Sequence, residues 1–393
     1  MANSILTPTA VTREALRILH QKLNFVGNVY REYDDSFAKT GAKIGTSLKI
    51  RLPNQYSVRT GAALSAQDTA ETSTTLTVST QKGVDLNFTS VDLTMSLDDF
   101  AKRILDPAMS VLAANIESDA LSMMNDVYNV VNNTGSALTM NKLLTGRKVL
   151  NDNLAPMSDR VALLNTQDNV DLIDALKGLF QDSAAIQKQY KEGMMGRTAG
   201  FDFYENTLIA NSTTGTDASN CTINGASQTG SAITIANGSS KTFAVGDVVT
   251  LAGVNRVHPE TKVSTGVAQQ FVVTSAVTAG GTTLNVSPAI VTSGATQNVS
   301  ASPTDTGAVT KIGSASGVYK PSMVFHPEAF TFATADLVMP QGVDFAAREV
   351  QDGISMRIVR QYDINNDRFP TRLDVLYGYK TIRPQLACRL LSN

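Results

Sequence analysis

One segment of about 100 residues in the second half of the chain carries almost no charge. Between Asn211 and Thr310 only seven residues are Asp, Glu, Lys or Arg. Short runs that alternate apolar and polar residues recur there, several of them separated by glycine, at 232–235, 247–251, 270–274 and 283–286. Alternation with period two indicates strands, and no helical period accompanies it. The segment therefore predicts a small β-barrel or sandwich.

The sequence on both sides of this segment has a mixed helix and strand pattern. The elements predicted before it are a helix over 139–151, a strand at Val161–Leu164, a helix capped by Thr166, a helix or turn over 183–191 and a strand from Phe201. Those predicted after it are a strand over 322–325, a helix over 327–335 and strands over 354–359, 372–379 and 386–391. Because α/β patterning returns after the charge-poor segment, we predict that 138–210 and 320–393 fold together around an inserted domain.

A long helix is predicted to begin at Asp106–Pro107, since an N-cap aspartate followed by proline is a helix start signal. Apolar residues then follow at steps of three or four, at Leu112, Ile116, Ala120, Met123, Val127 and Val131. Asn and Gly at 132–135 favour a helix end. A helix of about 24 residues would be a rod of roughly 36 Å.

Residues 46–91 predict a long β-hairpin. Period-two alternation at 48–52 resumes at 76–88, after a polar middle that is rich in Gly, Ala and Thr. An arm of about twenty residues would reach roughly 60 Å. Because a two-stranded ribbon is marginally stable alone, it needs a surface to lie on. That surface is either another subunit or the hairpin's own domain.

Residues 10–24 predict a short amphipathic helix, with apolar side chains at Val11, Ala15, Ile18, Leu19 and Leu23. It is either a core helix or an arm that packs on a neighbour. The 17% of charged residues is low for a globular protein. Either copies of the chain cover much of its surface, or the Ser/Thr-rich β segment lowers the average.

Composition also argues against several classes of partner. The net charge of −2 gives no basic excess, which tight binding to nucleic acid phosphates requires. Cys221 and Cys388 lie far apart in sequence and predict neither a disulfide framework nor a zinc site. The first 20 residues do not resemble a signal peptide, and no apolar run approaches the roughly 18 residues of a membrane span. We therefore expect folding in a cytoplasm and no membrane partner.

No motif for catalysis, a cofactor or a metal stands out. His20, His258 and His326 lie in unrelated contexts, and the two His-Pro-Glu runs lack the spacing of helical metal pairs, so we predict turns there. The run 363–367 resembles the start of a calcium loop, but Arg368 stands where that loop needs glycine. A polar hairpin turn is predicted instead, and the chain is predicted to be no enzyme and to hold no cofactor.

The order of these parts resembles that of the major capsid proteins of tailed bacteriophages. The run 192–203 is similar to the glycine-rich segment before the axial-domain sheet of that family. The run 372–379, with Arg383-Pro384, resembles its closing strands. The charge-poor segment, through 246–254, is similar to the insertion domain of podovirus coat proteins.

This resemblance implies an α+β phage-capsid (Johnson) fold with an inserted all-β barrel. The implied parts are an N-terminal arm at 1–35, a β-hairpin (E-loop) with peripheral-domain strands at 36–95, a spine-helix region of the peripheral domain at 96–137, a first axial-domain part at 138–210, an inserted β-barrel domain at 211–318, and an axial return with closing peripheral strands at 319–393.

The implied function is self-assembly into the icosahedral shell that encloses a phage's double-stranded DNA without tight sequence-specific binding. Copies would form pentamers and hexamers, be assembled in the host cytoplasm and end in the virion capsid. A portal protein and, because the chain lacks the extra N-terminal segment of coats fused to their scaffold, a separate scaffolding protein are the implied partners. Arg51, Arg59 and Glu71, in or near the hairpin, are the candidate charge partners between subunits, with solvated surface charge as the alternative.

Two other functions compete with this hypothesis. A virion decoration, tail or adhesin protein would bind a surface glycan through the Ser/Thr-rich β domain, although such proteins usually show repeats or fibre patterns that are absent here. A hydrolase would act through the Ser- and Asp-rich segments. A small fixed oligomer would favour the first alternative, and activity lost on a single polar substitution would favour the second.

Overall fold

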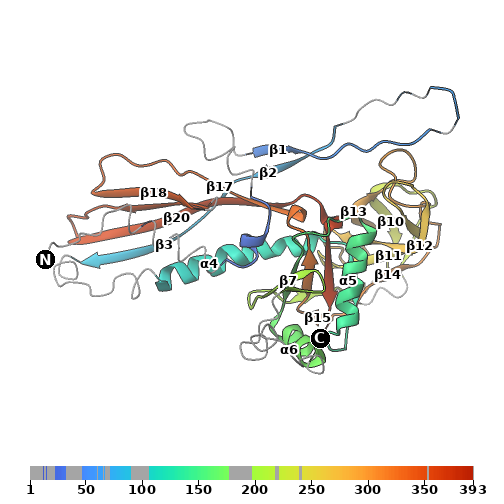
Figure 1. Cartoon of the computed structure of the whole chain (residues 1–393), viewed down its shortest axis with the longest axis horizontal. Coiled ribbons are helices and arrows are strands. Elements are labelled where there is room, and N and C mark those ends of the chain that lie inside the picture. The colour runs from blue at the N-terminus through green and yellow to red at the C-terminus, as the bar shows by residue number, and fades with distance from the viewer. Residues whose placement is uncertain are drawn as a thin grey trace. The chain divides into compact units, whose positions relative to one another are not determined.

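The computed structural model describes residues 12, 15, 23–31, 47–59, 61–64, 66, 71–89, 106–176, 197–216, 221–238, 241–351 and 354–392 (Figure 1). The chain divides into two compact units, and each is discontinuous in sequence. Unit 1 comprises Met1–Ile50, Ser73–Leu121 and Phe330–Lys380. Unit 2 comprises Arg51–Thr72, Ser122–Ala329 and Thr381–Asn393.

Unit 1 is built on a five-stranded sheet and one long helix. The strands are β3 (Thr80–Thr89), β17 (Phe330–Ala335), β18 (Phe345–Gln351), β19 (Ile354–Arg360) and β20 (Arg368–Thr381), in the order β17-β20-β19-β18 with β3 also paired to β20. In this sheet β3, β18, β19 and β20 pair antiparallel. The helix α4 (Asp106–Leu121) contacts β3 and buries Met109, Leu112 and Ile116. Phe332 and Tyr377 stack with ring centroids 5.5 Å apart in the core of this unit.

Two smaller elements complete the described part of unit 1. β1 (Ser47–Arg51) and β2 (Ser73–Thr77) form a two-stranded sheet. A 3-10 turn, η1 (Val26–Asn28), precedes Tyr30, which forms a parallel bridge with Thr331 of β17.

Unit 2 contains a six-stranded mixed sheet. Its order is β4-β21-β16-β5-β7-β6, with β4 (Val130–Asn132), β5 (Val161–Leu164), β6 (Arg197–Thr198), β7 (Phe201–Glu205), β16 (Ser322–Phe325) and β21 (Ala387–Leu391). β21 runs parallel to β4, and β5 runs parallel to β7. The helices α5 (Met140–Asp152) and α6 (Thr166–Leu176) belong to this unit, and α5 contacts β21, β16 and β4.

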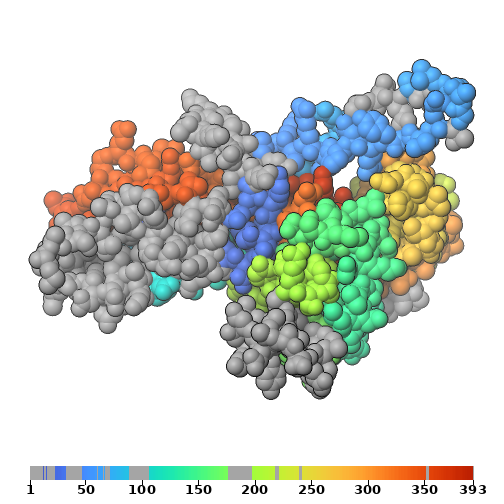
Figure 2. Space-filling model, viewed as in Figure 1, coloured from blue at the N-terminus to red at the C-terminus, as the bar shows by residue number. Residues whose placement is uncertain are grey.

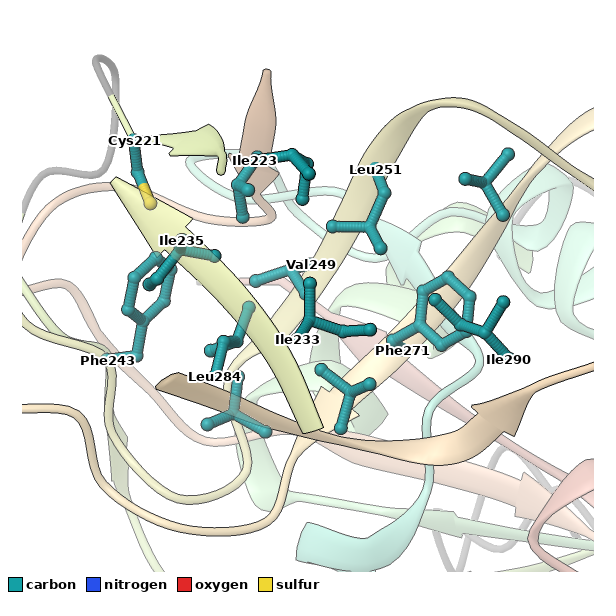
Figure 3. Packing of buried hydrophobic residues seen from close by; sticks show 14 of the residues in the cluster. Cys221, Ile223, Ile233, Ile235, Phe243, Val249, Leu251, Phe271, Leu284 and Ile290 are labelled. Carbon is teal, nitrogen blue, oxygen red and sulfur yellow. The ribbon is translucent and has the colours of Figure 1, made fainter. Parts of the chain in front are cut away.

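The charge-poor segment forms a β-barrel within unit 2. Its order is β14-β11-β12-β13-β10-β9, with β9 (Thr222–Ile223), β10 (Gly230–Ala236), β11 (Val248–Val257), β12 (Ser264–Val273), β13 (Thr283–Ile290) and β14 (Val309–Lys311). A bridge between Thr222 and Ala308 joins the two ends of this order. Alternate side chains, among them Ile233, Phe271 and Leu284, fill the interior (Figure 3). Where the chain enters and leaves the barrel, β8 (Ser212–Thr213) pairs with β15 (Val318–Tyr319).

The predicted helix over 107–131 is too long. α4 ends at Leu121, a 3-10 turn (η3) covers Ser122–Asp126, and Val130–Asn132 is strand β4. Val130 and Val131 are β-branched and pair with β21, and this pairing outweighs the helical spacing of the apolar residues.

The predicted helix over 327–335 is also wrong. Only Pro327–Ala329 forms a 3-10 turn (η5), and Phe330–Ala335 is the buried strand β17. A short apolar run has no period that separates a buried strand from a buried helix.

Other predictions need smaller corrections. The alternation at 76–88 does not belong to one hairpin, because β3 pairs with β20 along its whole length. Residues 330–380 fall in unit 1 and not with 138–210. The cap of α6 is Asn165, whose Oδ1 accepts from the Asp168 N–H at 2.7 Å, and not Thr166. Most of the helix predicted over 10–24, and all of 183–191, lie outside the described residues.

Candidate functional site

The segment between β1 and β2, residues 52–72, is an arm whose two limbs meet at its base. The Leu52 N–H donates to the Thr72 carbonyl at 2.9 Å. Beside this bond, Arg51 Nη1 and Glu71 Oε2 lie 3.3 Å apart, with side chains 78% and 53% exposed. An ion pair that exposed contributes little to stability in water, at most about 1 kcal/mol. It joins the two limbs beside the Leu52–Thr72 backbone bond.

Beyond its base the arm exposes apolar side chains. The described residues from Pro53 to Ala66 are all exposed, including Tyr56 at 58%, Val58 at 94% and Leu64 at 87%. The described residues of the arm are drawn in blue in Figure 2. Arg59 donates to the carbonyl of Gly61, within the arm itself. Three large apolar side chains without a core of their own favour burial against another surface.

Of the three predicted charge partners, the structure brings Arg51 and Glu71 together and places Arg59 in a local contact. The prediction that they contact a neighbouring subunit stays a prediction. Sequence analysis missed Tyr56, Val58 and Leu64, because single apolar residues in a polar stretch have no period to detect. They could have been found as apolar residues in a hairpin that is predicted to need a surface to lie on.

Two acidic side chains of α4 bond to the elements around it in unit 1; Glu117 is buried, and Asp119 is half-buried. Glu117 is 1% exposed, and its carboxylate accepts from the backbone N–H groups of Phe25 and Val26, the latter at 3.1 Å. Asp119 Oδ2 accepts from Lys82 Nζ at 2.7 Å and from the Tyr377 hydroxyl at 2.5 Å. Burial, and then the hydrogen bond to Asp119, raise the pKa of Tyr377, so the phenol stays a donor.

A second buried acid in this unit joins strands β19 and β20. Asp374 is fully buried and accepts from Arg357 at 2.7 Å and Arg372 at 2.8 Å. Burial alone would raise its pKa, but these two guanidinium groups outweigh burial and hold the pKa of Asp374 below its usual value. The carboxylate therefore stays charged and paired.

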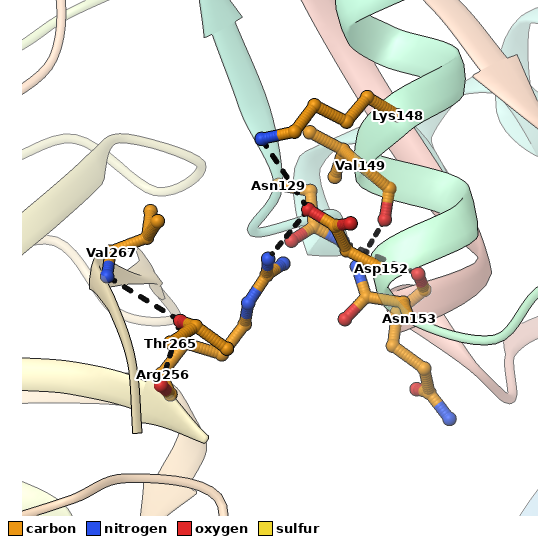
Figure 4. A network of polar contacts seen from close by, with 9 residues as sticks. Asn129, Lys148, Val149, Asp152, Asn153, Arg256, Thr265 and Val267 are labelled. Atoms are coloured by element: carbon orange, nitrogen blue, oxygen red, sulfur yellow. Dashed lines mark hydrogen bonds and ion pairs between the residues drawn. The ribbon is translucent and has the colours of Figure 1, made fainter. Parts of the chain in front are cut away.

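In unit 2 the barrel packs on the β4 end of the mixed sheet through one apolar cluster and several polar contacts. The cluster consists of Tyr128, Val130, Val248, Val272, Tyr319 and Leu391, with Ile312 against it. Arg389, which is 3% exposed, donates to the Gly246 carbonyl at 2.9 Å. Arg256 of β11 pairs with Asp152 of α5 at 3.0 Å, and Lys148 approaches the same carboxylate at 3.8 Å (Figure 4).

The two His-Pro-Glu runs and the acidic loop form turns, as the sequence predicts, and His20 lies outside the described residues. His258 Nδ1 accepts from the N–H groups of Glu260 and Thr261, both at 3.3 Å, and His326 Nδ1 accepts from the Glu328 N–H at 3.4 Å. Asp363 accepts from the Asn365 N–H and the Asn366 amide in the turn between β19 and β20. Within the described ranges, no three His, Cys, Asp or Glu residues gather as metal ligands would. None of the helices that the structure describes is long and apolar enough to cross a membrane.

Comparison with known proteins gives one family match. The family model described as P22 coat protein, gene protein 5, matches residues 37–391. No curated protein is significantly similar to the chain in sequence.

Among solved structures, the chain is similar to one from Mycobacterium phage Che8, with 14% identity over 94% of this chain and 90% of that chain and a TM-score of 0.48. It is similar to a virus-like particle from Pyrococcus furiosus, with 8% identity over 97% of each chain and a TM-score of 0.42. A CUS-3 coat protein I-domain is 32% identical over 25% of this chain and 97% of its own, with a TM-score of 0.19.

Proposed function

The chain belongs to the P22 coat protein family, and from that premise we propose that it builds its shell by laying the arm at 52–72 on a neighbouring copy. Family membership makes the chain a bacteriophage major capsid protein that assembles into an oligomeric shell and resides in the virion capsid. The α+β capsid fold with an inserted β-barrel, predicted from the sequence, is confirmed by the family match and the architecture.

The exposed apolar side chains of the arm support this proposal. Tyr56, Val58 and Leu64 are 58–94% exposed. Burying apolar surface is worth about 25 cal/mol per Å². The gain per arm is modest, but it is repeated at every copy of a closed lattice, where each contact makes the next one intramolecular.

The charged residues of the arm have two proposed roles. Arg51 and Glu71 hold the limbs together in the free subunit, and with Arg59 they contact charged groups of a neighbour in the shell. We further propose pentamers and hexamers, a separate scaffolding protein, a portal protein, assembly in the host cytoplasm and no catalytic activity. The net charge of −2 is consistent with a shell that encloses DNA without binding its phosphates tightly.

The boundaries of the parts also stay proposals. They are the arm at 1–35, the hairpin region at 36–95, the spine region at 96–137, the axial parts at 138–210 and 319–393, and the barrel at 211–318. No observation on the described residues favours a glycan-binding decoration or tail protein.

The test replaces the three apolar arm residues together, as Tyr56→Ser, Val58→Ser and Leu64→Ser. Because none of the three is buried, the free subunit should unfold at the same urea concentration as the wild type. Assembly, followed by sedimentation and electron microscopy, should fall at least tenfold in yield of closed particles. Deleting 55–70 should abolish closed particles and leave a soluble subunit.

A matched control places serine at two exposed apolar positions outside the arm, as Val338→Ser and Ile364→Ser, which are 82% and 80% exposed. These variants should assemble like the wild type. Normal particles from the arm deletion would refute the proposal. A wild-type protein that forms a small fixed oligomer and never assembles into shells would instead favour the decoration or tail function.

A further inference from the structure

β4 lies at one end of the six-stranded order in unit 2 that contains β21, so among the described residues no strand pairs with its other side. The backbone groups of Asn129 and Asn133 face β21. The Arg389 N–H donates to the Asn129 carbonyl at 2.9 Å, and the Asn133 N–H donates to the Leu391 carbonyl at 2.8 Å. Backbone groups alternate in direction along a strand. Those of Val130 and Asn132 therefore point away from β21.

The side chain of Gln270 occupies the place of a neighbouring strand at Val130. Its Oε1 accepts from the Val130 N–H at 2.7 Å, and its Nε2 donates to the Val130 carbonyl at 2.9 Å. Opposite residues of an antiparallel pair exchange their N–H and C=O groups in this same pattern. The primary amide of Gln270 is therefore a substitute for one peptide group.

The next outward carbonyl along the edge is also occupied by a side chain. Lys142 of α5 places its Nζ 3.2 Å from the Asn132 carbonyl. Both outward-facing carbonyls of this short strand are thus bonded to side chains. A lysine at such an edge also adds a charge that a second strand would have to desolvate.

The barrel holds Gln270 in this position. In β12, Phe271 and Val273 point into the barrel core, whereas Val272 belongs to the cluster that contains Val130. Side chains alternate along a strand, so Gln270 shares the face of Val272. Val248 and Val272 of the barrel pack in one cluster with Tyr128 and Val130. This packing places the Gln270 amide within hydrogen-bonding distance of the Val130 backbone.

We propose that Gln270, with Lys142, closes the free edge of β4 against strand pairing with a second copy of this chain. An open strand edge is a template for another strand. A shell subunit reaches high local concentrations of identical copies while it assembles, so an open edge would compete with the contacts that build the shell. The inserted barrel therefore directs assembly by covering a wrong surface.

The test compares two substitutions at one position. Gln270→Leu keeps the volume but leaves both Val130 groups open to another strand, whereas Gln270→Glu also loses the bond to the Val130 carbonyl but leaves a charge at the edge. Both variants should lose stability to urea. Only Gln270→Leu should raise, at least fivefold, the fraction of refolded protein that sediments as irregular aggregate. In that aggregate, amides of 127–134 should be protected from hydrogen exchange.

Two more variants separate edge pairing from a loosened barrel. Arg256→Gln breaks the ion pair to Asp152 and leaves Gln270 in place, so it should not aggregate in this way. Asn132→Pro, added to Gln270→Leu, removes an outward N–H and should return aggregation to near the wild-type level. Because aggregates that form during refolding are scored, a variant that never reaches the native state still gives a result.

Three outcomes would overturn the proposal. In the first, Gln270→Glu or Arg256→Gln aggregates as much as Gln270→Leu does. In the second, adding Asn132→Pro to Gln270→Leu does not lower the aggregated fraction. In the third, the amides of 127–134 in the aggregate exchange freely.

Discussion

At the residue scale, buried acids without a basic partner are sensitive to pH. Asp168, at the start of α6, is fully buried and accepts from the hydroxyls of Ser322 and Ser392 and from the Asn165 amide at 2.8 Å. Burial raises the pKa of Asp168, and these neutral donors only oppose it. A carboxyl group with a raised pKa favours the folded state most while protonated, and this contribution is lost as the pH rises through the folded pKa.

Asp168→Asn should therefore gain stability relative to the wild type as the pH rises from about 4. The asparagine keeps an acceptor and a donor for the same neighbours and does not ionise. Urea unfolding at a series of pH values measures the difference between the two proteins. A constant difference from pH 4 to 7 would contradict this explanation.

Glu117 gives a second prediction at this scale. Glu117→Gln leaves one oxygen to accept from the Phe25 and Val26 N–H groups and turns an amide donor toward them. An unsatisfied buried donor costs about 1–3 kcal/mol, so the free energy of unfolding should fall by that amount. Proteolysis near residues 23–31 should also quicken. Asn115→Gln, an exposed site on the same helix, is the control, and equal behaviour of the two variants would count against the role of Glu117.

At the element scale, sequence analysis succeeded where one local signal dominates. α5 begins one residue after the predicted 139, with Thr139 as its cap, and β10, β11, β12 and β13, four of the six barrel strands, fall where alternation places them. It failed where a distant strand decides the outcome, as at 130–132 and 330–335. The contact of Gln270 with Val130 could not be predicted either, because nothing near Gln270 in the sequence indicates it.

Gly378 shows how closely two elements approach in unit 1. A Cβ added there would lie 2.1 Å from the carbonyl oxygen of Thr77, the last residue of β2. Gly378→Ala must therefore push β2 and β20 apart and should cost about 1–3 kcal/mol, as other overpacked sites do. Gly27→Ala, with no atom within 4 Å of the added Cβ, is the matched control. Urea midpoints that agree for the two variants would contradict the close approach.

At the scale of the whole molecule, we propose that the arm at 52–72 completes its packing only in a shell. The low charge of the chain, 17%, fits a surface covered largely by other copies, although the barrel sequence contributes to it. The order of the predicted elements indicated the family. That order stays the same even when the predicted end of a helix or strand is wrong by several residues. The sequence did not predict which side chains of the arm are free to bind.

The most direct test is an electron cryo-microscopy map of particles assembled from the purified chain, at a resolution that shows side chains. We predict closed shells in which Tyr56, Val58 and Leu64 are buried against a neighbouring subunit. Particles in which residues 52–72 fold onto their own subunit, or leave these three side chains in solvent, would contradict the account.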